Sequence, residues 1–249
     1  MQTVILHLYP TIMYAQPLPN NASRAQTASV MMIISIVLFA IQTLKSLYKM
    51  TLDEYELESS TSLLIGEGIL GIIQFFITII SAIFFIMWFR RAYNNLHICG
   101  VKELPYKEGW AAGGWFVPFI SLYYPYRIMN SIWSGTQSAI RKIGEHYQRE
   151  EDGYIGWWWT FWIIANLISN IEAQITLRGL VSPFNPGTIA MELISNSSML
   201  LAGWLCWRLI GRTAALEEDL QGRYAEWLTY QTQQQAEQFQ QTLPANPEQ

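Results

Sequence analysis

The sequence predicts an all-α membrane protein. We expect four transmembrane helices, a proline-broken aromatic re-entrant or interfacial amphipathic helix on the cytoplasmic side, and a C-terminal soluble helix. Of the 249 residues, 51% are hydrophobic and only 14% are charged, whereas soluble domains carry about 25% charged residues. The charged residues gather between long uncharged runs, and about 20 apolar residues suffice to cross a bilayer.

The N-terminal segment, residues 1–24, is mildly apolar. It has no Lys or Arg near its start, and Pro10 interrupts its apolar run. A secretory signal peptide has a basic start and an apolar stretch before its cleavage site. We therefore expect an interfacial or poorly ordered segment, with cleavage as the alternative.

The first two spans are predicted at residues 25–47 and 62–89. The first is uncharged until Lys45, and Lys49 follows it. The second is uncharged from Gly68 through Phe89 and is followed by two arginines. Glu67 lies near the start of the second helix, where the helix dipole favours a carboxylate. We expect a structural role for it rather than a proton relay.

Residues 109–149 form the element on which the topology depends. The stretch is apolar and crowded with Trp, Phe and Tyr, which favour membrane–water boundaries, but Pro118 and Pro125 interrupt it. From Pro125 onward the pattern is that of an amphipathic helix, and such helices often lie in the interface plane. We expect this element to pack against the bundle.

The last two spans are predicted at residues 154–177 and 186–210, and the short turn between them makes them antiparallel neighbours. Asn166, Asn170 and Gln174 are four residues apart and so share one helical face. Together with Glu192 they form an intramembrane polar stripe. Such a stripe serves either as a helix–helix contact or as a substrate path.

The chain divides into three parts. An N-terminal segment (1–24) precedes a helical membrane domain (25–211), and a cytoplasmic helix with a disordered Gln-rich tail follows (212–249). In that last helix, contacts are expected from Leu216, Leu220, Trp227 and Leu228. This surface is a candidate for docking a partner.

The distribution of Lys and Arg indicates the orientation, since these residues accumulate on the cytoplasmic side. If residues 109–133 do not cross the membrane, twelve Lys and Arg residues lie inside and three outside. If they do cross, Arg127 lies within or beside the span, and the other fourteen split six against eight. The sequence therefore predicts four crossings with both termini in the cytoplasm.

An ordered series of motifs resembles a family of bacterial membrane proteins called domain of unknown function 4328. The resemblance covers about residues 69–221 and implies an integral domain of the bacterial inner membrane, with no activity or catalytic residues to carry over. The motifs are WFRRAYNNL at 88–96, GWA at 109–111, GWFVPF at 114–119, YPYR at 124–127, IW at 132–133, WW at 157–158, and the asparagines at 166 and 170.

The resemblance directs attention to polar and aromatic residues at the cytoplasmic face. Arginines with aromatic and amide neighbours form pockets that bind lipid head groups. In the alternative interpretation, the arginines anchor helices at the interface and the asparagines cap helix ends. The candidate lipid-binding residues are Arg91, Asn94, Asn95, Trp110, Trp115 and Arg127.

The sequence is compatible with two classes of function. No catalytic motif, cofactor loop or metal-ligand spacing occurs, Cys99 and Cys206 lie far apart, and the net charge of −4 argues against a nucleic-acid partner. The first hypothesis is a non-enzymatic anchor or scaffold that binds membrane lipids or a protein partner. The alternative is an oligomeric transporter or channel that uses the polar faces of the last two spans.

Overall fold

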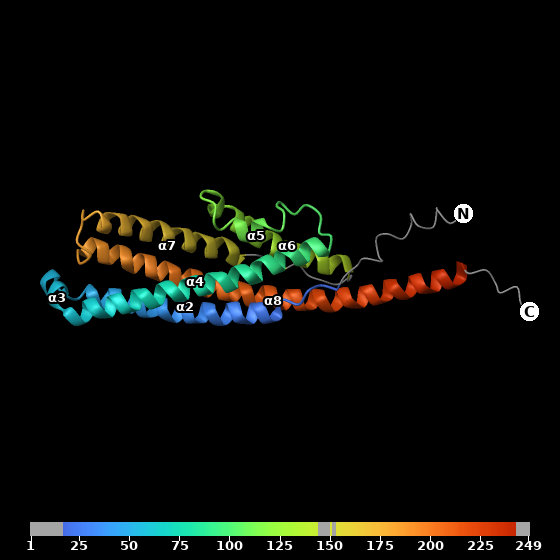
Figure 1. Ribbon diagram of the computed structural model, residues 1–249, viewed down its shortest axis with the longest axis horizontal. Coiled ribbons are helices and arrows are strands. Elements are labelled where there is room, and N and C mark those ends of the chain that lie inside the picture. Colours follow the sequence, from blue (N-terminus) through green and yellow to red (C-terminus); the bar gives the residue numbers. More distant parts are fainter. Residues whose placement is uncertain (1–16, 144–149, 151–152, 243–249) are drawn as a thin grey trace, which may run out of the picture.

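A computed structural model describes residues 17–143, 150 and 153–242. Every regular element among them is a helix, which confirms the all-α prediction. Expectations for residues 1–16, for the link at 144–149 and 151–152, and for the tail at 243–249 lie outside the described residues. Element labels follow Figure 1.

Four long helices make up the body of the described chain. Three of them are long and apolar enough to cross a membrane, over Ala22–Lys49, Ile65–Ile98 and Pro186–Gln238. The other, α7, has 25 residues, but its tryptophans and amides lower its hydropathy. The bounds are Ala22–Lys49 for α2, Thr61–Ile98 for α4, Gly153–Leu177 for α7 and Pro186–Thr242 for α8.

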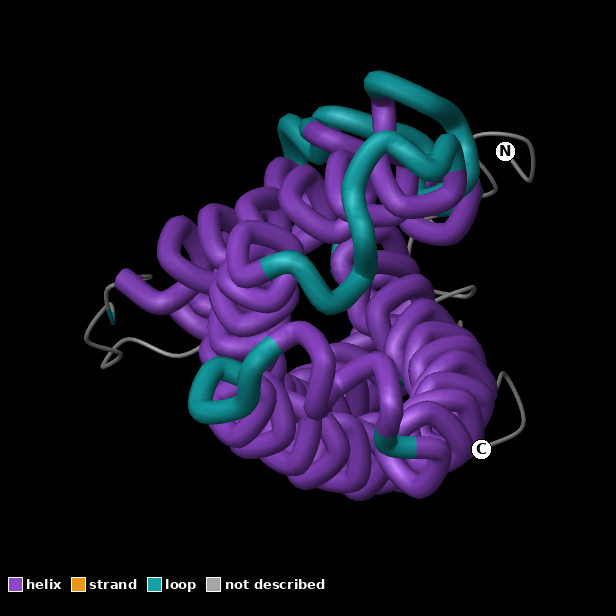
Figure 2. The backbone as a smooth tube through the Cα atoms, turned by 90° about the vertical axis from the view of Figure 1, so that its left-hand side faces the viewer, coloured by secondary structure: helices purple, strands orange, loops and turns teal. Residues whose placement is uncertain are grey.

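The long helices form an open arc (Figure 2). Their contacts give the order α7, α8, α2, α4 along it. Helix α2 packs against both α4 and α8, and α7 packs against α8, as the short turn between α7 and α8 predicted. Helices α4 and α7, at the two ends of the arc, share no interface of comparable extent in the described residues.

One end of the arc carries a cap made of α5 (Trp110–Gly113), the 3-10 helix η1 (Ile120–Leu122) and α6 (Tyr124–Ile143). The chain enters the cap from the end of α4 and leaves it toward the start of α7, at the same end of the bundle (Figure 1). Pro118 precedes a break in helical geometry, since Phe119 has a φ of 63°. Close packing of the cap backbone also requires a glycine at 114, because a Cβ at Gly114 would lie 2.8 Å from the Trp110 carbonyl oxygen.

The amphipathic pattern of α6 is fulfilled. Its buried side includes Ile128, Ile132 and Ile140, and the helix packs against α4 and α8. Arg212 of α8 strengthens this contact, because its guanidinium lies 5.0 Å from the Trp133 ring centroid and forms an ion pair with Glu150. The burial of apolar side chains of α6 and the contacts of Arg212 therefore both hold the cap against the bundle.

The opposite end of the arc holds two short connections. Helix α3 (Glu54–Ser59) begins with a capping box in which Asp53 and Glu56 exchange side-chain and backbone hydrogen bonds. Between α7 and α8, the Asn185 side chain accepts a hydrogen bond from the Gly187 N–H at 2.9 Å, with Pro186 as the first residue of the helix.

Helix α8 differs from the sequence prediction in its continuity. A span ending near residue 210 and a soluble helix after it were expected, and a single helix of 57 residues runs through both, and through the Gln-rich stretch, to Thr242. No proline interrupts it, and Leu216, Leu220 and Tyr224 are buried in the bundle. These three contacts are intramolecular, so residues 216–224 do not form a free docking surface.

Candidate functional site

The six predicted lipid-binding residues lie in different environments rather than in one pocket. Arg91 and Asn94 are partly exposed on the last turns of α4 and have no side-chain hydrogen bond or ion pair among the described residues. Arg127 lies over the Tyr123 ring at 5.6 Å. Trp110 packs edge-on against Tyr124 with ring centroids 5.2 Å apart.

The other two predicted residues point into the protein. The Trp115 ring packs against rings of α4 and α7, with centroid distances of 5.7 Å to Phe85 and 5.9 Å to Trp162. Asn95 is buried, with 2% of its surface exposed, and its amide donates to Glu217 at 3.2 Å and to the Pro19 carbonyl at 3.3 Å. Asn95 therefore belongs to a buried polar cluster.

This polar cluster, formed by Asn21, Asn95, Glu217 and Gln221, escaped the sequence analysis. The Asn21 amide donates to Glu217 Oε2 at 3.0 Å and to the Trp88 carbonyl at 3.3 Å. Gln221 donates to the Pro19 carbonyl at 3.2 Å. The cluster thereby joins the segment before α2 to the last turns of α4 and to the middle of α8.

Glu217 lies past Arg212, which follows the apolar run of α8, and is 5% exposed. Burial raises the pKa of its carboxyl to about 7, although the neighbouring amides of Asn21 and Asn95 and the Trp88 indole act in the opposite direction. The Oδ1 atoms of both asparagines have no donor among the described residues.

A sequence signal for this cluster did exist. Glu217 lies in line with Thr213, Leu220 and Tyr224, which follow the helical repeat of the buried face of α8. A carboxylate on an apolar face is unusual, because a buried charge is costly unless it is paired.

A second charged cluster lies at the opposite end of the bundle and joins α2, α4 and α8. Lys49 is 4% exposed, and its Nζ lies 2.6 Å from Glu192 and 2.8 Å from Glu67. Lys45 lies 3.7 Å from Glu192 and 3.6 Å from Glu67. Two lysines therefore face two carboxylates, and Glu67 and Glu192 both act as ion-pair partners.

The predicted polar stripe on α7 bonds mainly within its own helix. Asn166 donates to the Trp162 carbonyl at 2.8 Å, and Asn170 donates to the Asn166 carbonyl at 2.7 Å. Gln174 accepts from Arg178 at 3.1 Å. Hydrogen bonds between α7 and α8 come instead from the hydroxyls of Ser169 and Ser195. Glu192 is separate from the stripe, in the charged cluster.

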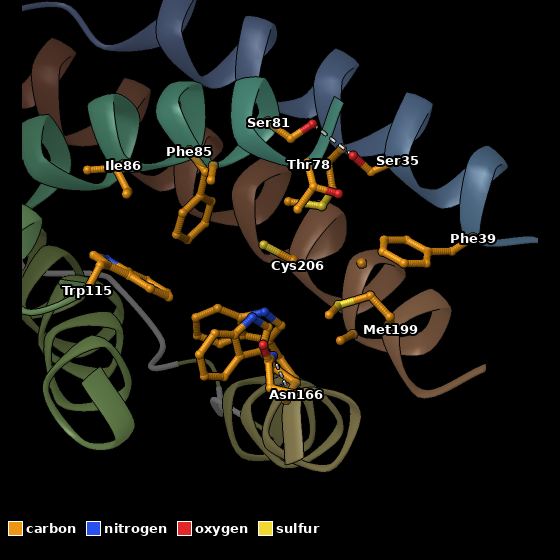
Figure 3. A pocket seen from close by; sticks show the side chains of 16 residues that line it. Ser35, Phe39, Thr78, Ser81, Phe85, Ile86, Trp115, Asn166, Met199 and Cys206 are labelled. Atoms are coloured by element: carbon orange, nitrogen blue, oxygen red, sulfur yellow. Dashed lines mark hydrogen bonds between the residues drawn. The ribbon is translucent and has the colours of Figure 1, made fainter. Parts of the chain in front are cut away.

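A cavity of about 280 Å³ lies inside the arc, beside the cap (Figure 3). All four long helices contribute to its wall, and Trp115 closes it from the cap side. The wall is mainly aromatic and aliphatic, with Met32, Met199 and Cys206 supplying sulfur atoms. Of the predicted site residues, Trp115 and Asn166 both line it, a juxtaposition that their separation in sequence did not suggest.

No group of three or more His, Cys, Asp or Glu side chains in the described ranges could hold a metal ion. Cys99 and Cys206 are free thiols, and burial raises the pKa of Cys99 to about 11. The described features are thus a buried carboxylate cluster, a neutral ion-pair cluster and an apolar cavity.

Together these features define an all-helical protein with helices apolar enough to cross a membrane. The chain belongs to the family described as Domain of unknown function (DUF4328), whose sequence model matches residues 48–215. This confirms the resemblance found in the motifs. No curated protein and no solved structure matches the chain. The matched range includes the cap and α7 but ends before Glu217.

Proposed function

We propose that this protein is a non-enzymatic, multi-pass anchor of the inner membrane that presents a helical arm to a protein partner in the cytoplasm. One observation carries the proposal: α8 runs without a break from an apolar run able to cross the membrane into an exposed segment. Residues 225–242, which we call the arm, extend beyond the rest of the described bundle (Figure 1). A rigid exposed helix on a membrane domain suits helix-mediated recognition.

Four crossings fit this proposal, with spans near residues 25–47, 62–89, 154–177 and 186–210. Helix α7 is the fourth span, since its 25 residues suffice for a hydrocarbon layer of about 30 Å. Its tryptophan-rich start suits a membrane interface. The cap stays on the cytoplasmic side, because its two connections to the long helices are at the same end of the bundle (Figure 1).

The charge distribution supports the same orientation. Three basic residues, Lys45, Lys49 and Arg178, would lie outside, against the positive-inside tendency. Both lysines are matched by Glu67 and Glu192, so the outer end carries little uncompensated positive charge. In this topology the cap side carries the other twelve Lys and Arg residues of the chain, and it is the number of basic residues rather than the net charge that favours the cytoplasm.

The transporter alternative finds less support. A path for a polar solute needs polar groups that are free to replace water, as selectivity sites do. The amides of the stripe residues Asn166 and Asn170 instead donate hydrogen bonds to carbonyls of their own helix. The cavity wall is mainly apolar. We therefore favour the anchor.

Thiol labelling of intact cells tests the topology. In a background with Cys99→Ser and Cys206→Ser, a single cysteine replaces either Tyr55 on α3 or Tyr230 on the arm, both exposed. Four crossings predict that a membrane-impermeant reagent labels the Tyr55→Cys chain from outside and the Tyr230→Cys chain only after permeabilisation. Labelling of both from the same side would contradict the proposal, since three or five crossings give that result.

Photo-crosslinking tests the anchor function. A photoreactive amino acid at Tyr230 should give a discrete protein adduct in cells, whereas the same amino acid at Ile69, an exposed residue of the α4 span, should not. An adduct containing two copies of this chain would identify a homo-oligomer as the partner. Equal patterns at both positions, or no protein adduct at Tyr230, would contradict the role of the arm.

A further inference from the structure

The cavity inside the arc opens where α4 and α7 diverge. Thr78 and Ala82 of α4 line the cavity and are also exposed, so they lie at its mouth. Ala202 and Cys206 of α8 line it as well but are buried, with 2% and 4% of their surfaces exposed. The cavity therefore leads inward from the outer surface of α4 to the buried side of α8.

The polar side chains in the wall are largely satisfied within the protein. The hydroxyls of Ser35 and Ser81 are 2.8 Å apart, and Ser81 also donates to the Met31 carbonyl at 3.1 Å (Figure 3). Thr78 accepts a hydrogen bond from the Gln74 amide at 3.1 Å. Buried polar groups that already have partners do not require water or a polar ligand.

Three donors in the wall differ from these. The indole N–H of Trp115 has no acceptor in the part of the chain that the structure describes, and those of Trp158 and Trp162, which also line the cavity, have no hydrogen bond among the described residues either. Unpaired indole donors in a mainly apolar wall suit a ligand that is mainly hydrocarbon and carries an oxygen atom at one end. Carboxyl and ester groups provide such an oxygen.

The size of the cavity limits the occupant further. At about 280 Å³ it is at the small end of ligand pockets, which range over about 300–1,000 Å³. A partner helix, with side chains about 10 Å across, would not fit, whereas a single flexible chain would. Met32 and Met199 adapt to such a chain, since methionine fills irregular apolar gaps.

We infer that this cavity binds one acyl chain of a membrane lipid, which enters between α4 and α7 and lies along the buried face of α8. The inference rests on the proposed function in one respect: with four crossings, the mouth at Ala82 faces the hydrocarbon of the bilayer. The shared chemistry is an acyl chain with a carbonyl oxygen, and it can come from a phospholipid or from a free fatty acid.

Photoreactive lipids test this inference on the full chain. The protein is reconstituted into phosphatidylcholine vesicles that contain either a phosphatidylcholine or a free fatty acid with a diazirine in mid-chain, and adducts are mapped by mass spectrometry after illumination. Cys206 is too buried for bulk lipid to reach, so an adduct at Cys206 or at neighbouring cavity residues reports an occupied cavity. We expect such adducts with at least one of the two probes, and the comparison identifies the source of the chain.

Two variants make the experiment specific. Ala82→Trp places a large ring at the mouth, where the exposed position tolerates it, and should lower labelling at Cys206 at least fivefold. Ile83→Trp adds the same ring to the neighbouring residue, which is 51% exposed and does not line the cavity, and should leave labelling unchanged. Labelling confined to the exposed face of α4, or equal labelling at Cys206 in both variants, would overturn the inference. The topology and arm experiments do not depend on this outcome.

Discussion

Glu217→Gln is expected to stabilise the protein at alkaline pH and to abolish much of its pH dependence. The folded-state pKa of Glu217 is about 7, raised by burial from the ordinary value of 4.5 for a glutamate carboxyl. Between these two pH values the folded protein keeps a proton that the unfolded chain has lost. The free energy of unfolding of the natural protein should therefore fall as the pH rises from about 4.5 to about 7 and remain level above that.

The magnitude follows from the difference in pKa. Each unit is worth about 1.4 kcal/mol, so the full effect is about 3 kcal/mol at pH 8. For a chain of this size, about 1 kcal/mol corresponds to about 2–4 °C in Tm, which gives an increase of roughly 6–12 °C.

Thermal unfolding in detergent, followed by circular dichroism from pH 5 to pH 8.5, measures this effect. The natural protein should lose stability from pH 5 to about pH 7 and change little above that, while the Glu217→Gln variant should show a flatter profile and the higher Tm at pH 8. Glu218→Gln is the matched control, because Glu218 is the exposed neighbour, and it should follow the natural protein. A Glu217→Gln variant that is less stable than the natural protein at pH 8 would refute this account of the cluster.

Two further predictions concern packing and ion pairs, and both are measured as changes in Tm. Lys49→Met should destabilise the protein by about 1–3 kcal/mol because it leaves Glu192 without its closest cation. Adding Glu192→Gln should recover part of this loss. No recovery would mean that the lysine acts through packing alone. Gly114→Ala should cost about 1–3 kcal/mol, since the new Cβ would lie 2.8 Å from a backbone oxygen. Gly135→Ala should cost less, because there the close atom, at 2.9 Å, is the flexible end of Leu96; equal costs would contradict the steric explanation.

Local patterns in the sequence predicted the elements of the fold well. The amphipathic repeat after Pro125 predicted α6 and its buried face, and the span predicted from residue 186 begins where α8 begins, at Pro186. These features depend on residues within one or two helical turns, where spacing and capping chemistry act directly. The family resemblance rests on the same kind of local motif.

Long-range contacts explain what the sequence could not predict. Asn95 was interpreted as part of a surface near the lipid head groups, but its partners, Pro19 and Glu217, are 76 and 122 residues away. Lys49 and Glu192 are likewise 143 residues apart. The order of the helices in the arc decides which polar side chains meet, and no local pattern fixes that order.

The continuity of α8 also has a mechanical consequence. No loop separates the apolar run of this helix from the arm, so a tilt of the helix as a unit is not absorbed by a hinge. The arm is about 27 Å long at 1.5 Å per residue, and a tilt of about 10° would displace its tip sideways by about 5 Å. With the arm in the cytoplasm, as proposed, changes in bilayer thickness, to which spanning helices respond by tilting, would become sideways displacements of the arm.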